Sequence, residues 1–299
     1  MAASYWESSQ RQFWTFSKPK LIAMRSKLEE SERSVVQQFP LPERRLLNIY
    51  FMQQIQRLGK KLGNLRQQAM ATAQVYVRRY YLTVELRRTN PYLVLSAALY
   101  IACKMEECPQ HIRIIVVEAH NLWPDAVMAD ISKLGECEFA IIAELSSQLI
   151  VHHPYRSLGE LQPTFGLETE ETTLAWSIIN DHYLTDLPLM YPPFIIAITA
   201  AFLAVVLRPS QSGTQGQIQA AGLAKALDSV TNAQSSPGSG PNPRVQKMVN
   251  WLAESSVDME QIVDCTQELI SLYEVWEQYN EKTCKDQISR FVKSRSLEK

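Results

Sequence analysis

Residues 90–107 read NPYLVLSAALYIACKMEE, and this stretch decides the fold class. It has the pattern of one helix. Asn90 is a residue type that caps helix N-termini, Pro91 suits the first helical position, and the residues that follow are apolar or small. The predicted helix ends in a charged segment that begins at Lys104.

Helical spacing of apolar residues recurs along the rest of the chain. Ala69, Ala73, Tyr76 and Tyr80 fall on one face of a helix that starts near Arg66. Two further stripes share this spacing: Leu134, Cys137, Ile141 and Leu145, and Met259, Ile262, Thr266, Leu269, Tyr273 and Trp276, the last with Asp258 or Ser256 as its cap. No convincing alternating strand pattern competes with them, and only 10 glycines are present. The sequence therefore predicts an all-α fold.

An internal repeat with an offset of 102 residues organises the chain. The tripeptide at 81–83, Tyr-Leu-Thr, recurs at 183–185, and Pro91 matches Pro193. The apolar helix after each proline also aligns, with small residues in register. The two copies differ at the end of this helix, where Lys104 of the first copy aligns with Val206 of the second. Such a departure marks either a lysine that complements the helix dipole or a residue recruited to a function.

Composition narrows the class of protein. A length of 299 residues predicts two domains, and 46% hydrophobic with 20% charged residues indicates a globular chain. A net charge of -1 argues against a protein that coats a polyanion.

The five cysteines form no CxxC pair, which favours free thiols in a reducing compartment. The start of the chain lacks a signal-peptide pattern, and the longest apolar run, 194–207, falls short of the ~20 residues that span a bilayer.

Motifs of catalysis and metal binding are absent from the sequence. There is no HExxH, GxSxG or Walker loop, and His152 and His153 are adjacent and so lie on different helix faces. The three other histidines, at 111, 120 and 182, are isolated, which is typical of structural histidines. We expect neither an enzyme nor a cofactor or metal site.

Several segments resemble the cyclin family. The helix ending ACKMEE after a Tyr-Tyr-Leu helix is similar to the first cyclin box. Other stretches narrow the resemblance to cyclins of the C type, the cyclins of the Mediator kinase module: YWESSQ (5–10), LRQQAMATAQVYVRRYY (65–81), GECEFAIIAEL (135–145), LIVHHPYRSL (149–158), LAWSIINDHYLTDLPLMYPPFIIAI (174–198) and LAESSVDMEQI (252–262). The Ser, Gly and Pro-rich stretch 208–244 departs from the animal pattern and indicates a fungal member.

The resemblance implies two tandem five-helix cyclin boxes. We expect an N-terminal helix and linker (1–38), a first box (39–150), a second box (151–279) with a disordered insertion at 208–244, and a C-terminal tail (280–299).

The resemblance also implies a non-catalytic, nuclear subunit that activates a kinase of the cyclin-dependent kinase 8 type and so regulates transcription by RNA polymerase II. Mediator subunits 12 and 13 are the expected further partners. We expect no direct binding to nucleic acid and no binding to a membrane. In the family, a lysine at the end of the third helix and a glutamate on the fifth bond to the kinase backbone, and they map onto Lys104 and Glu136. The alternative for Glu136 is an ordinary solvated glutamate. The adjacent Glu106 and Glu107 could face the arginine cluster that anchors the kinase activation loop, or they could simply end a solvated helix.

A second set of residues predicts a partner groove between the repeats. It comprises Trp6, Arg66, Trp176, Asn180, Asp181 and Tyr273. The alternative is an internal Arg66–Asp181 pair that locks the repeats together.

Two rival functions remain open. A DNA-binding cyclin fold, as in transcription factor IIB, would use basic pairs such as Arg78-Arg79, but acidic residues balance these over the chain. A cyclin of another transcriptional kinase is the second rival. Residues 48–52, NIYFM, lack the substrate-docking motif of cell-cycle cyclins, so we expect no docking of that kind.

Overall fold

The computed structural model describes residues 4–63, 65–207 and 243–297, and every regular element in these ranges is helical. The predicted all-α class is confirmed. The chain divides into two compact units, Met1–His152 with Tyr279–Lys299, and His153–Gln278. All but the last two residues of the predicted insertion 208–244 lie outside the described ranges. Among the described helices, none has both the length and the apolar character needed to cross a membrane.

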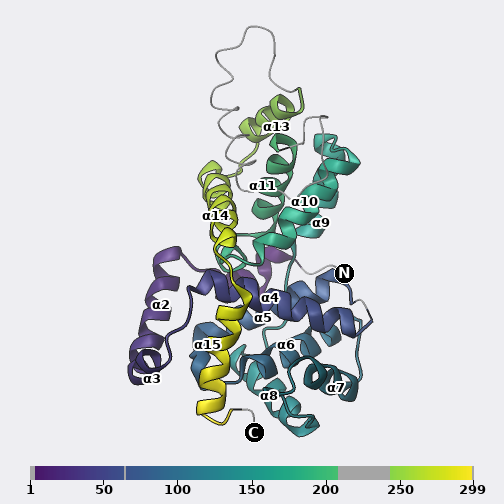
Figure 1. The fold of residues 1–299 in the computed structure, drawn as a ribbon. Helices are drawn as coiled ribbons and strands as arrows, with labels where there is room; N and C mark the ends of the chain where they lie inside the picture. Colours follow the sequence, from purple (N-terminus) through teal and green to yellow (C-terminus); the bar gives the residue numbers. More distant parts are fainter. Residues whose placement is uncertain (1–3, 64, 208–242, 298–299) are drawn as a thin grey trace. The chain divides into compact units, whose positions relative to one another are not determined.

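The first unit contains a set of five helices, in which four pack around a central one (Figure 1). These are α4 (Arg44–Lys61), α5 (Gln67–Thr83), α6 (Pro91–Met105), α7 (Ile112–Leu122) and α8 (Ile131–Glu144). Helix α6 packs against the other four. Its Ala97, Ala98 and Ala102 are fully buried, and such small side chains let neighbouring helices approach closely.

The second unit repeats this order of elements. Its helices are α9 (Pro154–Phe165), α10 (Thr169–His182), α11 (Pro193–Val206), α13 (Pro243–Glu254) and α14 (Met259–Glu277). Helix α11 packs against the other four, as α6 does. A short 3-10 helix precedes each central helix, η2 (Leu86–Arg88) before α6 and η3 (Leu187–Leu189) before α11. The repeat read from the sequence therefore corresponds to two equivalent five-helix sets.

The helix starts follow from the residues that the sequence places there. The Asn90 side chain accepts a hydrogen bond from the Tyr92 backbone N–H at 3.1 Å, with Pro91 as the first residue of α6. Asp258 caps α14 in the same way through the Glu260 N–H at 3.0 Å. Each carboxylate or amide oxygen satisfies a backbone donor that has no partner within the helix.

The N-terminal region contains more helices than the single one predicted. They are η1 (Tyr5–Glu7), α1 (Ser9–Phe13), α2 (Lys18–Ser31) and α3 (Arg33–Gln38). Pro19 lies in the first turn of α2, where proline is favoured because the backbone N–H groups there have no partner within the helix. Between α1 and α2, the Trp14 indole donates to Gln148 Oε1 at 2.6 Å and lies 5.0 Å from the buried Arg79 guanidinium, which fastens this region to the first box.

The stretch 280–299, expected as a tail, contains the helix α15 (Glu281–Ser294), which packs on α4 of the first unit. Cys284, Ile288, Phe291 and Val292 are buried at helical spacing, and this pattern predicts an amphipathic helix. The Tyr279 hydroxyl, just before α15, donates to Gln53 Oε1 at 2.7 Å. The stretch 280–299 therefore contains a helix packed on the first unit, which the expectation of a C-terminal tail did not specify.

Candidate functional site

Lys104 lies in the last turn of α6, where its side chain is 40% exposed. Its ammonium forms an ion pair with Glu138 of α8 and lies 4.2 Å from the centre of the Tyr100 ring. The Glu138 side chain is only 13% exposed. These two contacts hold the ammonium over the junction of α6 and α8, and an ammonium has three donors, of which Glu138 needs one.

Glu136, the predicted companion of Lys104, lies on another face of α8. Its side chain is 69% exposed and its carboxylate lies 3.5 Å from Lys133 Nζ, one turn away. Residues two apart on a helix point about 200° apart, so Glu136 and Glu138 cannot both face α6. Glu136 is open to a partner, whereas the contact with Lys104 is made by Glu138, which the sequence analysis missed. Glu138 lies one helical turn after the buried Leu134, and this spacing places the two residues on the same face of α8. That spacing was the signal in the sequence that could have identified Glu138.

The two glutamates after Lys104 have different surroundings. The Glu106 carboxylate accepts hydrogen bonds from Gln68 Nε2 and Thr72 Oγ1 of α5, both at 2.6 Å. It therefore joins α6 to α5. Glu107 is exposed and has a backbone φ of 53°, in the left-handed region that favours glycine.

The backbone around Glu107 explains that conformation. The Cys108 N–H donates to the Cys103 carbonyl at 3.0 Å, and the Glu107 N–H donates to the Lys104 carbonyl at 3.4 Å. This pair of bonds ends a helix through one left-handed residue, a position that glycine most often fills. A glutamate costs roughly 1 kcal/mol more there, so its carboxylate is presented to solvent at the expense of stability.

Large apolar side chains are exposed on the helices that carry these charges. Phe139 of α8 is 75% exposed, and Met105 of α6 is 39% exposed. Helices α6, α7 and α8 pack against one another (Figure 1), and Ile114 and Val117 of α7 are each 50% exposed. Phe139 lies off the buried stripe of α8, a signal that the sequence analysis did not use. Exposed aromatic and aliphatic groups among charges are typical of a protein interface.

Four of the six residues predicted for a partner groove lie in the second unit, and their contacts involve two tyrosines. The Tyr273 hydroxyl donates to Asp181 Oδ2 at 2.9 Å. The Tyr155 hydroxyl donates to Asn180 Oδ1 at 2.8 Å, and the Tyr155 ring stacks on Trp176 with centroids 4.5 Å apart. The structure thus brings these four together and adds Tyr155, which sequence reasoning missed although it stands in the HHPYRSL segment.

Burial changes the acidity of this cluster. It raises the pKa of Asp181 from its ordinary value near 4 to about 6, and the hydrogen bond from Tyr273 opposes that rise. Burial also raises the pKa of Tyr273. Trp176 is 41% exposed beside these groups, so a polar pair with a partly exposed aromatic side chain lies at this surface.

The remaining two groove residues, Trp6 and Arg66, belong to the first unit. Trp6 is 53% exposed with the Arg11 guanidinium 5.0 Å from its ring, and Arg66 is the exposed N-cap residue of α5. That all six residues share one groove stays a prediction, as does the alternative of an Arg66–Asp181 lock.

No metal-binding group of three or more His, Cys, Asp or Glu side chains occurs in the part of the chain that the structure describes. The five cysteines are free, and burial raises the pKa of Cys103 and Cys137 to about 12 each, which keeps both as neutral thiols. The isolated histidines make local hydrogen bonds: His111 accepts from the Arg113 N–H at 3.2 Å, and His120 Nδ1 lies 2.7 Å from the Val127 carbonyl.

Comparison with known proteins gives consistent results. Residues 18–150 match the family described as "Cyclin, N-terminal domain". The chain is 57% identical over its full length to the whole of the RNA polymerase II holoenzyme cyclin-like subunit of Aspergillus oryzae. It is 50% identical to the protein of the same name from Neurospora crassa, also with full coverage of both chains.

Solved structures share the fold. A chain of the CAK complex of Chaetomium thermophilum, solved with bound ATP-gamma-S, is similar with a TM-score of 0.65 and 23% identity, over 100% of this chain and 91% of that one. A chain of the yeast TFIIK complex matches with a TM-score of 0.59 and 17% identity, over 89% of this chain and 100% of that one.

Proposed function

The chain belongs to the cyclin family, and from that premise we propose that it is a cyclin of the C type, a non-catalytic subunit that binds and activates a cyclin-dependent kinase 8-type kinase in the Mediator kinase module. The name shared by its fungal relatives, which places them in the RNA polymerase II holoenzyme, supports a role in transcription and hence in the nucleus.

The observation that carries the proposal is the arrangement at the end of α6. Lys104 is held by Glu138 and Tyr100 with donors to spare, Glu107 is fixed in a left-handed turn, and Phe139 is 75% exposed on the adjoining α8. A surface of this kind can bury apolar area while directing a cation and an anion at fixed main-chain or side-chain groups of a partner.

Activation would be a matter of positioning. A kinase is active when its mobile helix places a glutamate against the lysine that orients the ATP phosphates. A cyclin bound to that helix stabilises the inward position and so shifts the equilibrium between two kinase states. Lys104 and Glu136 would bond to the kinase backbone beside the helix, and Met105 and Phe139 would supply apolar contact area.

The two consecutive glutamates would then divide their roles. Glu106 bonds to Gln68 and Thr72 and so maintains the junction of α5 and α6. Glu107 is the exposed carboxylate that could lie against the activation-loop arginines and partly replace a phosphate there. This assignment revises the expectation that both residues serve the kinase directly.

The cluster of Trp176, Asn180, Asp181 and Tyr273 is a candidate surface for the other Mediator subunits, 12 and 13, together with Trp6 and Arg66. Its support is a partly exposed tryptophan next to a buried carboxylate of raised pKa, a combination that suits a basic group from a partner.

Coexpression with candidate cyclin-dependent kinases tests the function. The chain should copurify with a kinase of the 8 type and raise its phosphorylation of a peptide substrate, and the charge reversals Lys104→Glu and Glu136→Lys together should abolish both. Lys60→Glu is the matched control, because Lys60 is an exposed lysine in the last turn of α4. Copurification with a different transcriptional kinase instead would favour the second rival function.

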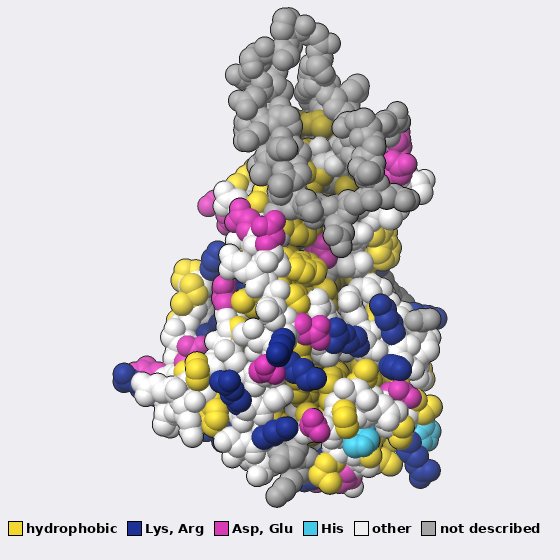
Figure 2. Space-filling view, in the orientation of Figure 1, with side chains coloured by type: hydrophobic (Ala, Val, Ile, Leu, Met, Phe, Trp, Pro, Cys, Tyr) yellow, Lys and Arg dark blue, Asp and Glu magenta, His cyan; other side chains and the backbone are white. Residues whose placement is uncertain are grey.

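The DNA-binding alternative predicts a different surface. In Figure 2, Lys and Arg side chains on the visible face are interspersed with Asp, Glu and neutral groups, which does not form a continuous basic track. Duplex binding at sub-micromolar strength that falls steeply with salt would support this alternative and contradict the proposal.

A further inference from the structure

Two of the five cysteines lie at the two ends of the turn that closes α6. Cys103 is fully buried near the end of the helix, and Cys108 is half-buried just beyond it. The Cys108 N–H donates to the Cys103 carbonyl at 3.0 Å, and the left-handed Glu107 before it reverses the chain. In a helix end of this kind, the side chains at these two positions commonly pack against each other. The backbone therefore brings the two thiols to one side of the turn.

The two thiols are in contact. Burial raises the pKa of Cys103 to about 12, and Cys108 adds to this rise through its charge and through a side-chain hydrogen bond. A hydrogen bond that raises the pKa favours the protonated form, so the Cys103 S–H donates and the Cys108 sulfur accepts. Pro109 follows Cys108, and the residue before a proline is restricted to extended backbone, which helps to hold Cys108 in place.

The two thiols differ in their access to solvent. Cys103 is 0% exposed, whereas Cys108 is half-buried. A small reagent in solution therefore meets Cys108 first, and oxidation of a thiol follows its accessibility. The structure assigns the two residues unequal roles, with Cys108 at the surface and Cys103 behind it.

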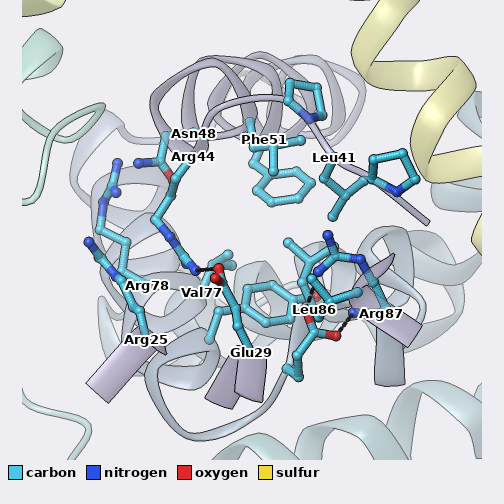
Figure 3. Close-up of a pocket in the computed structure, with 16 residues that line it drawn as sticks. Arg25, Glu29, Leu41, Arg44, Asn48, Phe51, Val77, Arg78, Leu86 and Arg87 are labelled. Atoms are coloured by element: carbon cyan, nitrogen blue, oxygen red, sulfur yellow. Dashed lines mark hydrogen bonds and ion pairs between the residues drawn. The ribbon is translucent and has the colours of Figure 1, made fainter. Parts of the chain in front are cut away.

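A pocket of about 350 Å³ in the same unit gives no second route to the pair. Its described lining comes from α2, α3, the linker 39–43, α4, α5 and the segment 85–87, and includes neither a cysteine nor a residue of α6. Figure 3 shows Arg25, Arg44 and Arg78 on one side of this pocket. A reagent that enters it meets these groups and not the thiols at the end of α6.

We propose that Cys103 and Cys108 form a reversible disulfide when the protein meets hydrogen peroxide, with Cys108 as the thiol that is oxidised first and Cys103 as the thiol that resolves it. The bond closes a ring over residues 104–107, the charged end of α6. This modification site is a property of the isolated chain and goes beyond the proposed function.

The reaction balances in two steps. In the first, the Cys108 sulfur attacks hydrogen peroxide: an S–O bond forms, the O–O bond breaks, and the thiol proton leaves with the second oxygen as water. The sulfur is oxidised by two electrons, and the peroxide is reduced. In the second, the Cys103 sulfur attacks the sulfenic acid on Cys108: the S–S bond forms, the S–O bond breaks, and the hydroxyl leaves with the Cys103 proton as water. Because the two sulfurs are already in contact, this step is intramolecular, which offsets the low reactivity of a neutral thiol.

The disulfide restricts the turn that it encloses. Its formation draws the two sulfurs from hydrogen-bond contact to about 2.0 Å. The backbone bonds from the Glu107 and Cys108 N–H groups close the end of α6, and the ring holds both in place. Lys104 and Glu107 lie within the ring, so where the proposed function holds, oxidation acts on the segment that binds the kinase.

Mass spectrometry on the full chain without any kinase tests the site. The protein is treated with hydrogen peroxide, its free thiols are blocked, and it is digested with trypsin. Trypsin cleaves after Lys104, so Cys103 and Cys108 fall in separate peptides, 89–104 and 105–113, each with no other cysteine. We expect these two peptides to be joined, with the loss of two hydrogen atoms, and to separate again with dithiothreitol.

Cys137→Ser is the matched control, because Cys137 is also half-buried and burial alone raises its pKa. This variant should form the linked peptides as the unchanged chain does, whereas Cys108→Ser should abolish them. In the unchanged chain, the link should form at least about tenfold faster than Cys137 is oxidised. Circular dichroism melting shows whether each variant is folded. If Cys108→Ser unfolds, Cys103→Ala carries the test, since it should stop Cys108 at the sulfenic acid or beyond, with no link.

Hydrogen exchange tests the effect on the turn. The Glu107 and Cys108 N–H groups should exchange at least about threefold more slowly in the oxidised chain. Oxidation of Cys108 to the sulfinic acid without a linked peptide would overturn the proposal, as would a link that joins two chains on a non-reducing gel, or faster exchange at the turn. These measurements involve no kinase, so their failure is distinct from a failure of the proposed function.

Discussion

Lys104 of α6 and Glu138 of α8 form an ion pair at the edge of the first unit, with the Glu138 side chain only 13% exposed. This pair fixes the direction of the ammonium in the free protein. A lysine held in this way loses less side-chain entropy when it binds a partner than a freely rotating one.

Replacing Glu138 with Gln should therefore weaken kinase binding although Glu138 itself is not expected to touch the kinase. We expect about a fivefold loss of affinity, smaller than the tenfold or greater loss for Lys104→Ala, because the glutamine only loosens the lysine. Surface plasmon resonance with the purified kinase measures both. The Glu138→Gln and Lys104→Ala losses should not add in the double variant, and full additivity would contradict the positioning role.

Glu107→Gly should make the chain more stable and a poorer kinase activator. Glycine adopts a φ of 53° without strain, so the free energy of unfolding should rise by about 1 kcal/mol. Glu107→Ala removes the carboxylate and keeps the strain, so it should lose activation without gaining stability. Denaturant melts measure the change in stability, and a peptide phosphorylation assay measures kinase activation. Undiminished activation by both variants would show that Glu107 is not part of the kinase interface.

Stability should depend on pH through Asp181. Its pKa is about 6 in the folded chain and near 4 when unfolded, so the folded state binds the proton more tightly. The stabilising contribution of protonated Asp181 is fully present below pH 4 and is lost as the pH rises through 6, by up to about 3 kcal/mol.

Asp181→Asn should flatten this dependence between pH 4 and 6 and raise stability at pH 7, since the amide oxygen can still accept from Tyr273. Urea melts across that pH range measure the change. A loss of stability at pH 7 would indicate that ionised Asp181 has a compensating cation, as the predicted lock with Arg66 would provide.

Helix α15 should be needed for the stability of the first unit. Phe291 is fully buried, and Phe291→Ala should lower the free energy of unfolding by roughly 3 kcal/mol. Arg290→Ala, at an exposed position of the same helix, should change it by less than about 0.5 kcal/mol. Equal melting temperatures for the two variants would show that α15 is dispensable.

The sequence alone determined the repeat, the class of fold and many helix boundaries. Asn90-Pro91 and Asp258 marked helix starts, and Ala69, Ala73 and Tyr76 marked a buried face, because capping and helical periodicity depend on residues close together in the chain. It also located the charged end of α6 as the place where the two copies differ.

Only the tertiary structure decided which charges meet. Glu138 rather than Glu136 reaches Lys104, Glu106 bonds to α5, and Arg25, Arg44 and Arg78 border one pocket from three helices. These relationships join residues about 20 to 50 positions apart, and they depend on the rotation of each helix about its axis, where one residue shifts the direction by about 100°. A periodic pattern identifies the buried face of a helix, but the packing of neighbouring helices selects which polar side chains come into contact.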